Sequence, residues 1–170
     1  MERKDIRRMF THLSAGDALG KVCSKYTVGE VKEIYGGKIT GLVKPMRNNS
    51  KRNWKKGDVT DDTILTLLMA DSLIENNGFD RKDLARRLID CPDPRGGNQI
   101  ELLKSSGDVE YVANTGESNG SSIRISPLSI VYKDLWELTT KVVDSCTLTH
   151  GTYEAITSSL LLSYTLNYVS

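Results

Sequence analysis

The sequence predicts an all-α fold. Apolar residues recur at helical spacing through most of the 170 residues, and helix start and stop signals separate these stretches. Residues 38–43 are the only weak candidate for a strand. No internal repeat or low-complexity tract interrupts the pattern, so we expect one domain over residues 1–170 with an apolar core of its own.

Each predicted helix has a recognisable face or boundary. The first carries apolar residues on one face: Ile6, Met9, Phe10 and Leu13. Side chains suited to an N-cap precede the next four: Thr27 (with Glu30 as a capping box), Thr60, Asp80 and Asn98. These helices stop at Gly, Asn or Pro signals: 36–37, 76–78, 91–92 and Gly107. After polar loops at 38–58 and 114–122, apolar helical stretches follow at 123–132, 135–143 and 153–169.

The last predicted helix is apolar on most faces and reaches Ser170 without a stop signal. A helix of this kind must be buried. We therefore expect either an oligomer or a segment missing from this chain, as in a truncated or split gene product, to cover it.

Composition excludes several classes of partner. Lys and Arg number 23 against 22 Asp and Glu, so the net charge of +1 favours neither nucleic acid nor an anionic membrane surface. No apolar stretch approaches the roughly 20 residues that span a bilayer. The three cysteines are widely spaced, with no CxxC motif, which disfavours zinc ribbons and disulfide frameworks and indicates a reducing, cytoplasmic setting.

The most informative motif is Thr60-Asp61-Asp62-Thr63, at the entrance of an apolar helix. Two carboxylates and two hydroxyls are hard oxygen donors of the kind that Mg²⁺ or Mn²⁺ prefers. The alternative is helix capping, in which Thr60 is the N-cap and the acids favour the helix dipole by about 0.3–1 kcal/mol each.

Asp17 falls on the apolar stripe of the first helix, in register with Ile6, Phe10 and Leu13, and is flanked by Gly16 and Gly20. A buried carboxylate needs a cation or several donors, because leaving it unpaired costs several kcal/mol. Asp17 therefore either supports a cation site or caps a neighbouring helix.

The loop at 116–122 and His150 are two further, separate candidates. Asn119 and Gly120 precede Ser121 and Ser122 at an expected helix start, where N–H groups can hold a phosphate. The alternatives are an ordinary Asn-Gly turn and a histidine that caps a helix or fills the core.

Four segments, in order along the chain, resemble the ADP-ribosylglycohydrolase family. They read GDALG at 16–20, GDVTDDT at 57–63, NGSSIRISPL at 119–128, and TH at 149–150 followed by EA at 154–155. The resemblance implies an orthogonal all-α bundle that binds up to two Mg²⁺ or Mn²⁺ ions and hydrolyses ADP-ribosyl or related ribosyl bonds. Its substrate would be an ADP-ribosylated protein or a small ADP-ribosyl or ribosyl compound.

The resemblance also assigns residues. Thr60, Asp61 and Asp62 would be metal ligands, with Asp61 and Asp62 also catalytic. Asp17 would support them. Substrate-binding residues would be Gly116, Ser118, Asn119, Gly120, Ser121, Ser122 and His150.

Two departures from the family pattern bear on activity. Ser24 stands where family members commonly carry a glutamate, and no D-x-D-[ST] motif follows to supply the remaining metal ligands. We therefore expect little or no turnover from the 170-residue chain. A non-catalytic protein that binds ADP-ribose or a nucleotide is the alternative, and a purely structural role for the acids is a third.

Overall fold

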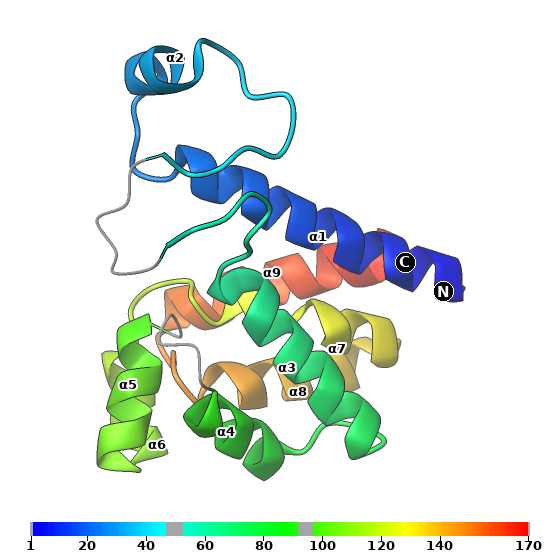
Figure 1. Cartoon of the computed structure of the whole chain (residues 1–170). Coiled ribbons are helices and arrows are strands. Elements are labelled where there is room, and N and C mark those ends of the chain that lie inside the picture. The colour runs from blue at the N-terminus through cyan, green and yellow to red at the C-terminus, as the bar shows by residue number, and fades with distance from the viewer. Residues whose placement is uncertain (1, 47–52, 92–96, 170) are drawn as a thin grey trace. The chain divides into compact units, whose positions relative to one another are not determined.

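A computed structural model describes residues 2–46, 53–91 and 97–169 (Figure 1). The chain divides into two compact units, Glu2–Thr63 and Ile64–Ser170, which are described separately below. Every regular element in the described ranges is helical, which confirms the all-α prediction. The weak strand candidate at 38–43 is not a strand. The expectation of a single domain stays a prediction.

Two helices lie entirely within the described part of the first unit, and both were predicted. Helix α1 (Arg3–Cys23) is the long helix in Figure 1, and α2 (Val28–Tyr35) is short. The predicted capping box forms, since the Thr27 N–H donates to Glu30 Oε2 at 2.8 Å and the Glu30 N–H donates to Thr27 Oγ1 at 3.3 Å. Gly36 ends α2 with φ at 76°, a left-handed conformation that glycine adopts without strain.

The polypeptide after α2 has no regular structure in its described parts, as predicted, and residues 47–52 of that loop lie outside the described ranges. Two side chains anchor the rest. Tyr35 Oη accepts a hydrogen bond from the Met46 N–H at 2.9 Å. Trp54 is buried, and Lys21 Nζ lies 4.6 Å from the centre of its ring. A cation at that distance from an indole face is attracted to it.

Seven α-helices are described in the second unit or entering it. They are α3 (Asp61–Glu75), which begins in the first unit, α4 (Arg81–Asp90), α5 (Gly97–Ser106), α6 (Val109–Thr115), α7 (Ser126–Val131), α8 (Leu135–Cys146) and α9 (Tyr153–Val169). A 3₁₀ helix (Ser122–Arg124) precedes α7.

Three features of these helices differ from the prediction. Helix α6 was not predicted. Asn98 does not cap α5, because that helix already includes Gly97. The helix expected from residue 123 starts only at Ser126, after the 3₁₀ turn.

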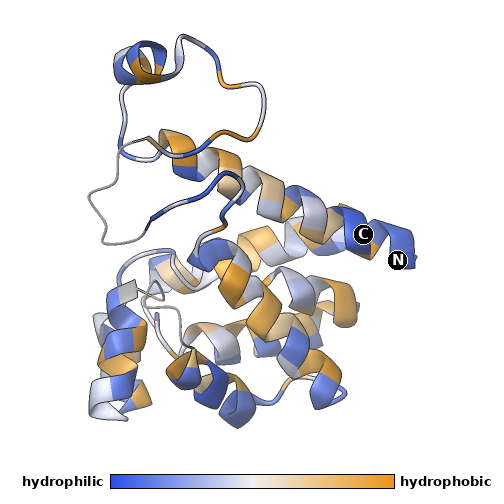
Figure 2. Cartoon of the chain, viewed as in Figure 1, coloured by the Kyte–Doolittle hydropathy of each residue, from blue (hydrophilic) through white to orange (hydrophobic). Residues whose placement is uncertain are grey.

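The core of the second unit is a continuous apolar cluster drawn from α3, α4, α5, α7 and α8. Its buried residues are Leu65, Met69, Leu73, Leu84, Leu88, Ile100, Ile125, Leu128, Tyr132, Leu138, Val142, Cys146 and Leu148. Figure 2 shows the change along α3 from a hydrophilic start to apolar residues further on. Burial at roughly 25 cal/mol per Å² of apolar surface makes this cluster the main stabilising element of the unit.

Helix α9 is only partly buried among the described residues. Its buried positions are small residues, Ala155, Ser159 and Ser163, which allow close packing. Several of its large side chains are exposed, including Leu161 at 68% and Tyr168 at 91%, whereas Ile156 and Leu160 pack partly buried against the core. That an oligomer or a segment missing from this chain covers the helix stays a prediction.

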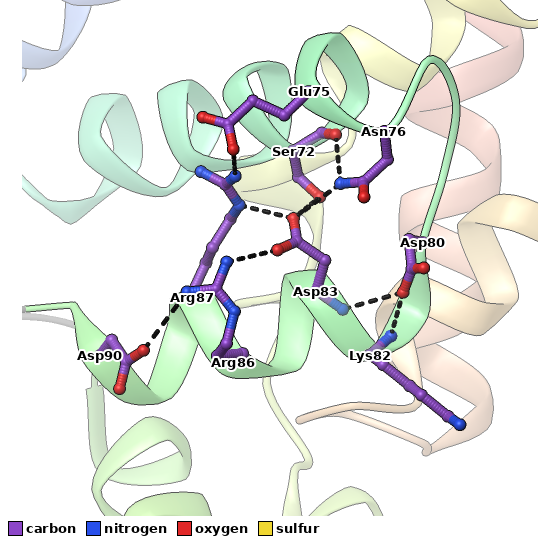
Figure 3. A network of polar contacts seen from close by, with 9 residues as sticks. All are labelled: Ser72, Glu75, Asn76, Asp80, Lys82, Asp83, Arg86, Arg87 and Asp90. Carbon is purple, nitrogen blue, oxygen red and sulfur yellow. Dashed lines mark hydrogen bonds and ion pairs between the residues drawn. The ribbon is translucent and has the colours of Figure 1, made fainter.

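A polar network joins the end of α3 to α4 (Figure 3). Asp83 accepts hydrogen bonds from Ser72 at 2.7 Å, Asn76 at 2.9 Å and Arg87 Nε at 2.6 Å, and Arg86 also donates to it. Burial opposes the charged form of Asp83, but the bonds from Arg87, Ser72, Arg86 and Asn76 outweigh it and hold the pKa of this carboxyl well below its usual value. The network fixes the angle between two helices that contribute to the core.

Two global expectations from the sequence can be compared with the structure. All three cysteines are unpaired thiols: Cys23 is exposed, while Cys91 and Cys146 are buried. Within the described ranges, no helix combines the length and the apolar character that crossing a bilayer requires.

Candidate functional site

Asp17 organises the first candidate site, at the start of α3. Its Oδ2 accepts hydrogen bonds from the Thr60 N–H at 2.8 Å and from Thr63 Oγ1 at 2.6 Å, with a longer one from the Thr63 N–H at 3.3 Å. Its Oδ1 accepts the hydroxyl hydrogen of Thr60 at 2.7 Å. The half-buried carboxylate is therefore satisfied by four donors, and the alternative that Asp17 caps a neighbouring helix is confirmed.

This arrangement also orients the Thr60 hydroxyl. Because Thr60 Oγ1 donates its hydrogen to Asp17, its lone pairs are left to act as acceptors. One of them receives the Asp62 N–H at 3.3 Å. The other has the chemistry of a cation ligand.

Asp61 and Asp62 occupy the first turn of α3, where the helix dipole favours negative charge. Desolvation raises the pKa of Asp62, and the negative charges of Asp61 and Asp17 raise it further. The neighbouring carboxylates thus disfavour the ionised form of Asp62, and a bound cation would relieve that repulsion.

The donor set is incomplete as a metal site. Within residues 2–46, 53–91 and 97–169, no three His, Cys, Asp or Glu side chains are grouped closely enough to hold an ion. The oxygen donors at 60–62 therefore fit a hard divalent cation in their chemistry, while the remaining ligands would have to be water or come from elsewhere.

The second candidate site, in the second unit, is built on a close approach of two backbones. A Cβ at Gly116 would lie 2.1 Å from the Thr149 carbonyl oxygen and 2.7 Å from His150 Cα, so only glycine fits there. The His150 N–H donates to the Cys146 carbonyl at 2.8 Å, and the Gly151 N–H donates to the Ala113 carbonyl at 2.8 Å. The end of α6 and the loop after α8 are thereby held together.

Ser118 and Gly120 meet the His150 ring. Ser118 Oγ lies 3.1 Å from His150 Nε2 and accepts a bond from the Gly120 N–H at 3.4 Å. A Cβ at Gly120 would come within 2.8 Å of Nε2, so glycine is again needed. Three of the predicted substrate-binding residues are thus brought together: an exposed hydroxyl, a glycine and a histidine that is only 7% exposed.

The other residues of the loop are engaged differently. The Ser121 hydroxyl is fully buried and lies 3.0 Å from Ser159 Oγ on α9, and Ser122 Oγ lies 3.0 Å from the same atom. The Ser122 N–H donates to the carbonyl of Asn119 at 3.0 Å, closing the 3₁₀ turn. The prediction that an α-helix begins at Ser121 is therefore wrong. The Ser122 N–H, which was expected to be free for a phosphate, already donates a hydrogen bond within the chain.

Arg124 is the principal residue of this region to which the sequence assigned no role. It is 1% exposed, and its guanidinium donates to the Ser145 carbonyl at 2.7 Å and to Thr149 Oγ1 at 2.8 Å. Thr149 Oγ1 lies 2.8 Å from His150 Nδ1. Burial, together with the nearby positive charge of Arg124, lowers the pKa of His150 to about 4, so the imidazole is neutral at pH 7. The sequence signal that could have identified Arg124 as important is its position as a charged residue in an otherwise apolar stretch.

Comparison with known proteins agrees with this fold. The family model of ADP-ribosylglycohydrolase matches residues 3–169. The uncharacterized protein YegU of Escherichia coli K12 is 24% identical over 166 residues, covering 89% of this chain and 50% of that protein. An uncharacterized protein of Archaeoglobus fulgidus is 25% identical over 140 residues, covering 78% of this chain and 44% of that protein.

A solved structure, described as an ADP-ribosylglycohydrolase-related protein complex, superposes with a TM-score of 0.66 at 28% identity. It is matched over 91% of this chain and 52% of its own length. The fold and the sequence thus define an all-α glycohydrolase-type protein. The chain belongs to the ADP-ribosylglycohydrolase family, whose members are generally metal-dependent, and it spans about half the length of the relatives it matches.

Proposed function

We propose that this chain supplies part of a metal-dependent site that hydrolyses the glycosidic bond of an ADP-ribosyl or related ribosyl group. In this proposal Thr60, Asp61 and Asp62 hold Mg²⁺ or Mn²⁺, and the 116–122 loop with His150 binds the ADP-ribose. The substrate would be an ADP-ribosylated protein or a small ADP-ribosyl compound.

The capping of α3 by Asp17 supports this proposal most directly. If Asp61 and Asp62 served only the helix end, the sequence would not need a third acid to bond the Thr60 and Thr63 donors. Asp17, on α1, caps α3. It also accepts the hydroxyl hydrogen of Thr60, which leaves the lone pairs of that hydroxyl to act as acceptors. Placing two further carboxylates at the same helix end is favourable when a cation joins them.

The reaction assigns separate tasks to these residues. A bound Mg²⁺ or Mn²⁺ would lower the pKa of water and hold ribose hydroxyls. A carboxylate oxygen of Asp61 or Asp62 would accept the proton of the attacking water. The negative charge of the other carboxylate would stabilise the oxocarbenium-like centre at the sugar carbon.

The loop has donors suited to the anionic part of ADP-ribose. Ser118 offers a hydroxyl at the surface and Asn119 an exposed amide side chain, while Gly120 lets the His150 ring lie close to the loop. Ser121 is buried, so a role in binding would fall to its backbone.

Ser24 favours a second candidate function. It caps the C-terminal end of α1, where family members commonly have a glutamate, and a hydroxyl cannot act as a carboxylate base. A protein that binds ADP-ribose without cleaving it would keep the 116–122 loop and lose the chemistry.

Metal binding can be tested without activity by electron paramagnetic resonance of Mn²⁺. Adding the wild-type chain should reduce the signal of free Mn²⁺, and a variant with Asp61→Asn and Asp62→Asn should leave that signal unchanged. Asp71→Asn, an exposed acid on the same helix, is the matched control and should behave as the wild type. Identical titration curves for the double variant and the wild type would refute the metal assignment.

A turnover assay and ADP-ribose calorimetry together separate the two functions. If the chain releases ADP-ribose from an ADP-ribosylated substrate, even slowly, and this release requires Mn²⁺, the hydrolase is supported. Binding of ADP-ribose that ignores metal and survives the Asp61 and Asp62 substitutions supports the non-catalytic binder.

A further inference from the structure

Among the described residues, the buried Arg124 guanidinium has no carboxylate partner. The Arg124 guanidinium donates to the Ser145 carbonyl at 2.7 Å, to Ser145 Oγ at 3.3 Å and to Thr149 Oγ1 at 2.8 Å, and all three acceptors are neutral. Burying a charge with neutral partners alone is unfavourable compared with an apolar side chain of similar size. The guanidinium charge therefore affects how the neighbouring side chains hydrogen-bond.

The Thr149 hydroxyl transmits that effect. An arginine can only donate, so Thr149 Oγ1 must accept from Arg124. Thr149 is fully buried, and its own hydroxyl hydrogen needs an acceptor, since a buried unpaired donor costs about 1–3 kcal/mol. His150 Nδ1, 2.8 Å away, is the acceptor in position. Nδ1 therefore carries no hydrogen.

The histidine passes the polarity on to the loop. A neutral imidazole that accepts at Nδ1 carries its hydrogen on Nε2. That hydrogen points to Ser118 Oγ, 3.1 Å away, which also receives the Gly120 N–H at 3.4 Å. Both lone pairs of Ser118 are then occupied, and its exposed hydroxyl can act toward a ligand only as a donor.

We propose that Arg124 is a positioning residue, which acts through Thr149 to hold His150 in the Nε2-protonated tautomer and so presents the Ser118 hydroxyl as a donor to an anionic ligand group. The identity of the ligand group, a phosphate of ADP-ribose, rests on the proposed function. The tautomer of His150 is inferred from the hydrogen bonds alone and does not depend on that function. The low pKa of His150 agrees, because both burial and the Arg124 charge disfavour an imidazolium that would donate from both nitrogens.

The tautomer can be read directly by long-range ¹H–¹⁵N correlation NMR on the ligand-free protein at pH 7. His150 should show one pyrrole-type nitrogen at Nε2 and one pyridine-type nitrogen at Nδ1. His12, which is exposed on α1, gives the second histidine signal, and His12→Gln assigns it. An Nδ1-protonated His150, or an imidazolium, in the wild-type protein would overturn the inference.

A matched pair of substitutions tests the role of Thr149. Thr149→Ser keeps the hydroxyl and should retain the Nε2-protonated tautomer. Thr149→Val removes the hydroxyl and should give a mixture of tautomers or the Nδ1-protonated one. An unchanged tautomer in Thr149→Val would show that the relay does not set it.

Ser118→Ala covers the case in which Thr149→Val does not fold, because Ser118 is exposed. The tautomer should persist in Ser118→Ala, since it is set from the Thr149 side, and a switch in this variant would contradict the proposed direction.

Calorimetry with ADP-ribose supplies the functional readout. Thr149→Val and Ser118→Ala should each weaken binding about five- to tenfold, while Thr149→Ser should stay within about twofold of the wild type. Equal affinity in Thr149→Val and the wild type would refute the positioning role. If the wild type shows the expected tautomer but binds no ADP-ribose, the relay stands and the proposed function fails.

Discussion

Gly116→Ala tests the backbone contact on which the 116–122 loop depends. A Cβ at this position would lie 2.1 Å from the Thr149 carbonyl oxygen, whereas ordinary van der Waals contact begins at about 3.4 Å. The two segments must therefore separate by about 1.3 Å, the difference between these distances. The backbone dihedral φ of Gly116 is −86°, so alanine causes no conformational strain of its own and the effect is purely steric.

The neighbouring atoms cannot move away easily. They are backbone atoms, and the N–H groups of Thr149 and His150 are both bonded to the Cys146 carbonyl, at 3.0 Å and 2.8 Å. Overpacking of this kind lowers the free energy of unfolding by about 1–3 kcal/mol. In a chain of this size, that corresponds to a fall in Tm of roughly 2–4 °C per kcal/mol.

Urea and thermal unfolding followed by circular dichroism measure the loss, and the His150 resonances report the displacement of the ring. Gly20→Ala, in the last turn of α1, is the control, because a Cβ there meets nothing within 4 Å and alanine in a helix should stabilise by up to about 1 kcal/mol. Wild-type stability of Gly116→Ala, with unshifted His150 signals, would refute the reasoning.

Three further outcomes are expected. Asp17→Asn should lower the free energy of unfolding by about 1–3 kcal/mol, because an amide replaces a carboxylate that accepts four hydrogen bonds. Asp5→Asn, at a side chain that is 42% exposed, should change it little in the same urea titration. Burial and the Arg124 charge lower the pKa of His150 from its ordinary value of 6.5 to about 4 in the folded chain, so the free energy of unfolding should be full above pH 6.5 and fall by about 2 kcal/mol by pH 5. His150→Gln should remove this loss. Asp83→Asn should cost about 1–3 kcal/mol at pH 7, against less than about 0.5 kcal/mol for Asp90→Asn, whose side chain is 64% exposed.

The helices that the sequence predicted well are those with local signals. Thr27 with Glu30, and Asp80 with the donors at Lys82 and Asp83, are capping arrangements within four residues of chain, and the structure contains both. Helix α6 was missed because its seven residues are too few to show a helical period, although Asp108 caps it in the same way.

The sites were predictable only in part, because their decisive contacts are distant in sequence. Asp17 could be recognised as a buried acid that needs partners, and capping of another helix was one expected answer. The identity of the capped helix, 43 residues further on, could not be read from the pattern. Likewise, Arg124 reaches Thr149 across 25 residues, so the sequence predicted His150 as a site residue without the side chains that orient it.

The two candidate sites share a physical principle. In each, a buried or half-buried ionised side chain bonds a threonine hydroxyl and so decides whether that hydroxyl donates or accepts: Asp17 acts on Thr60, and Arg124 acts on Thr149. The hydrogen-bonding role of the residues expected to contact metal or ligand is therefore determined by other residues that make no such contact. Loss of function after substitution of Asp17 or Arg124 consequently cannot establish contact with substrate, because the same change removes hydrogen bonds that hold helices together. Only substitutions that keep the hydroxyl and the fold while changing its polarity can distinguish the two effects.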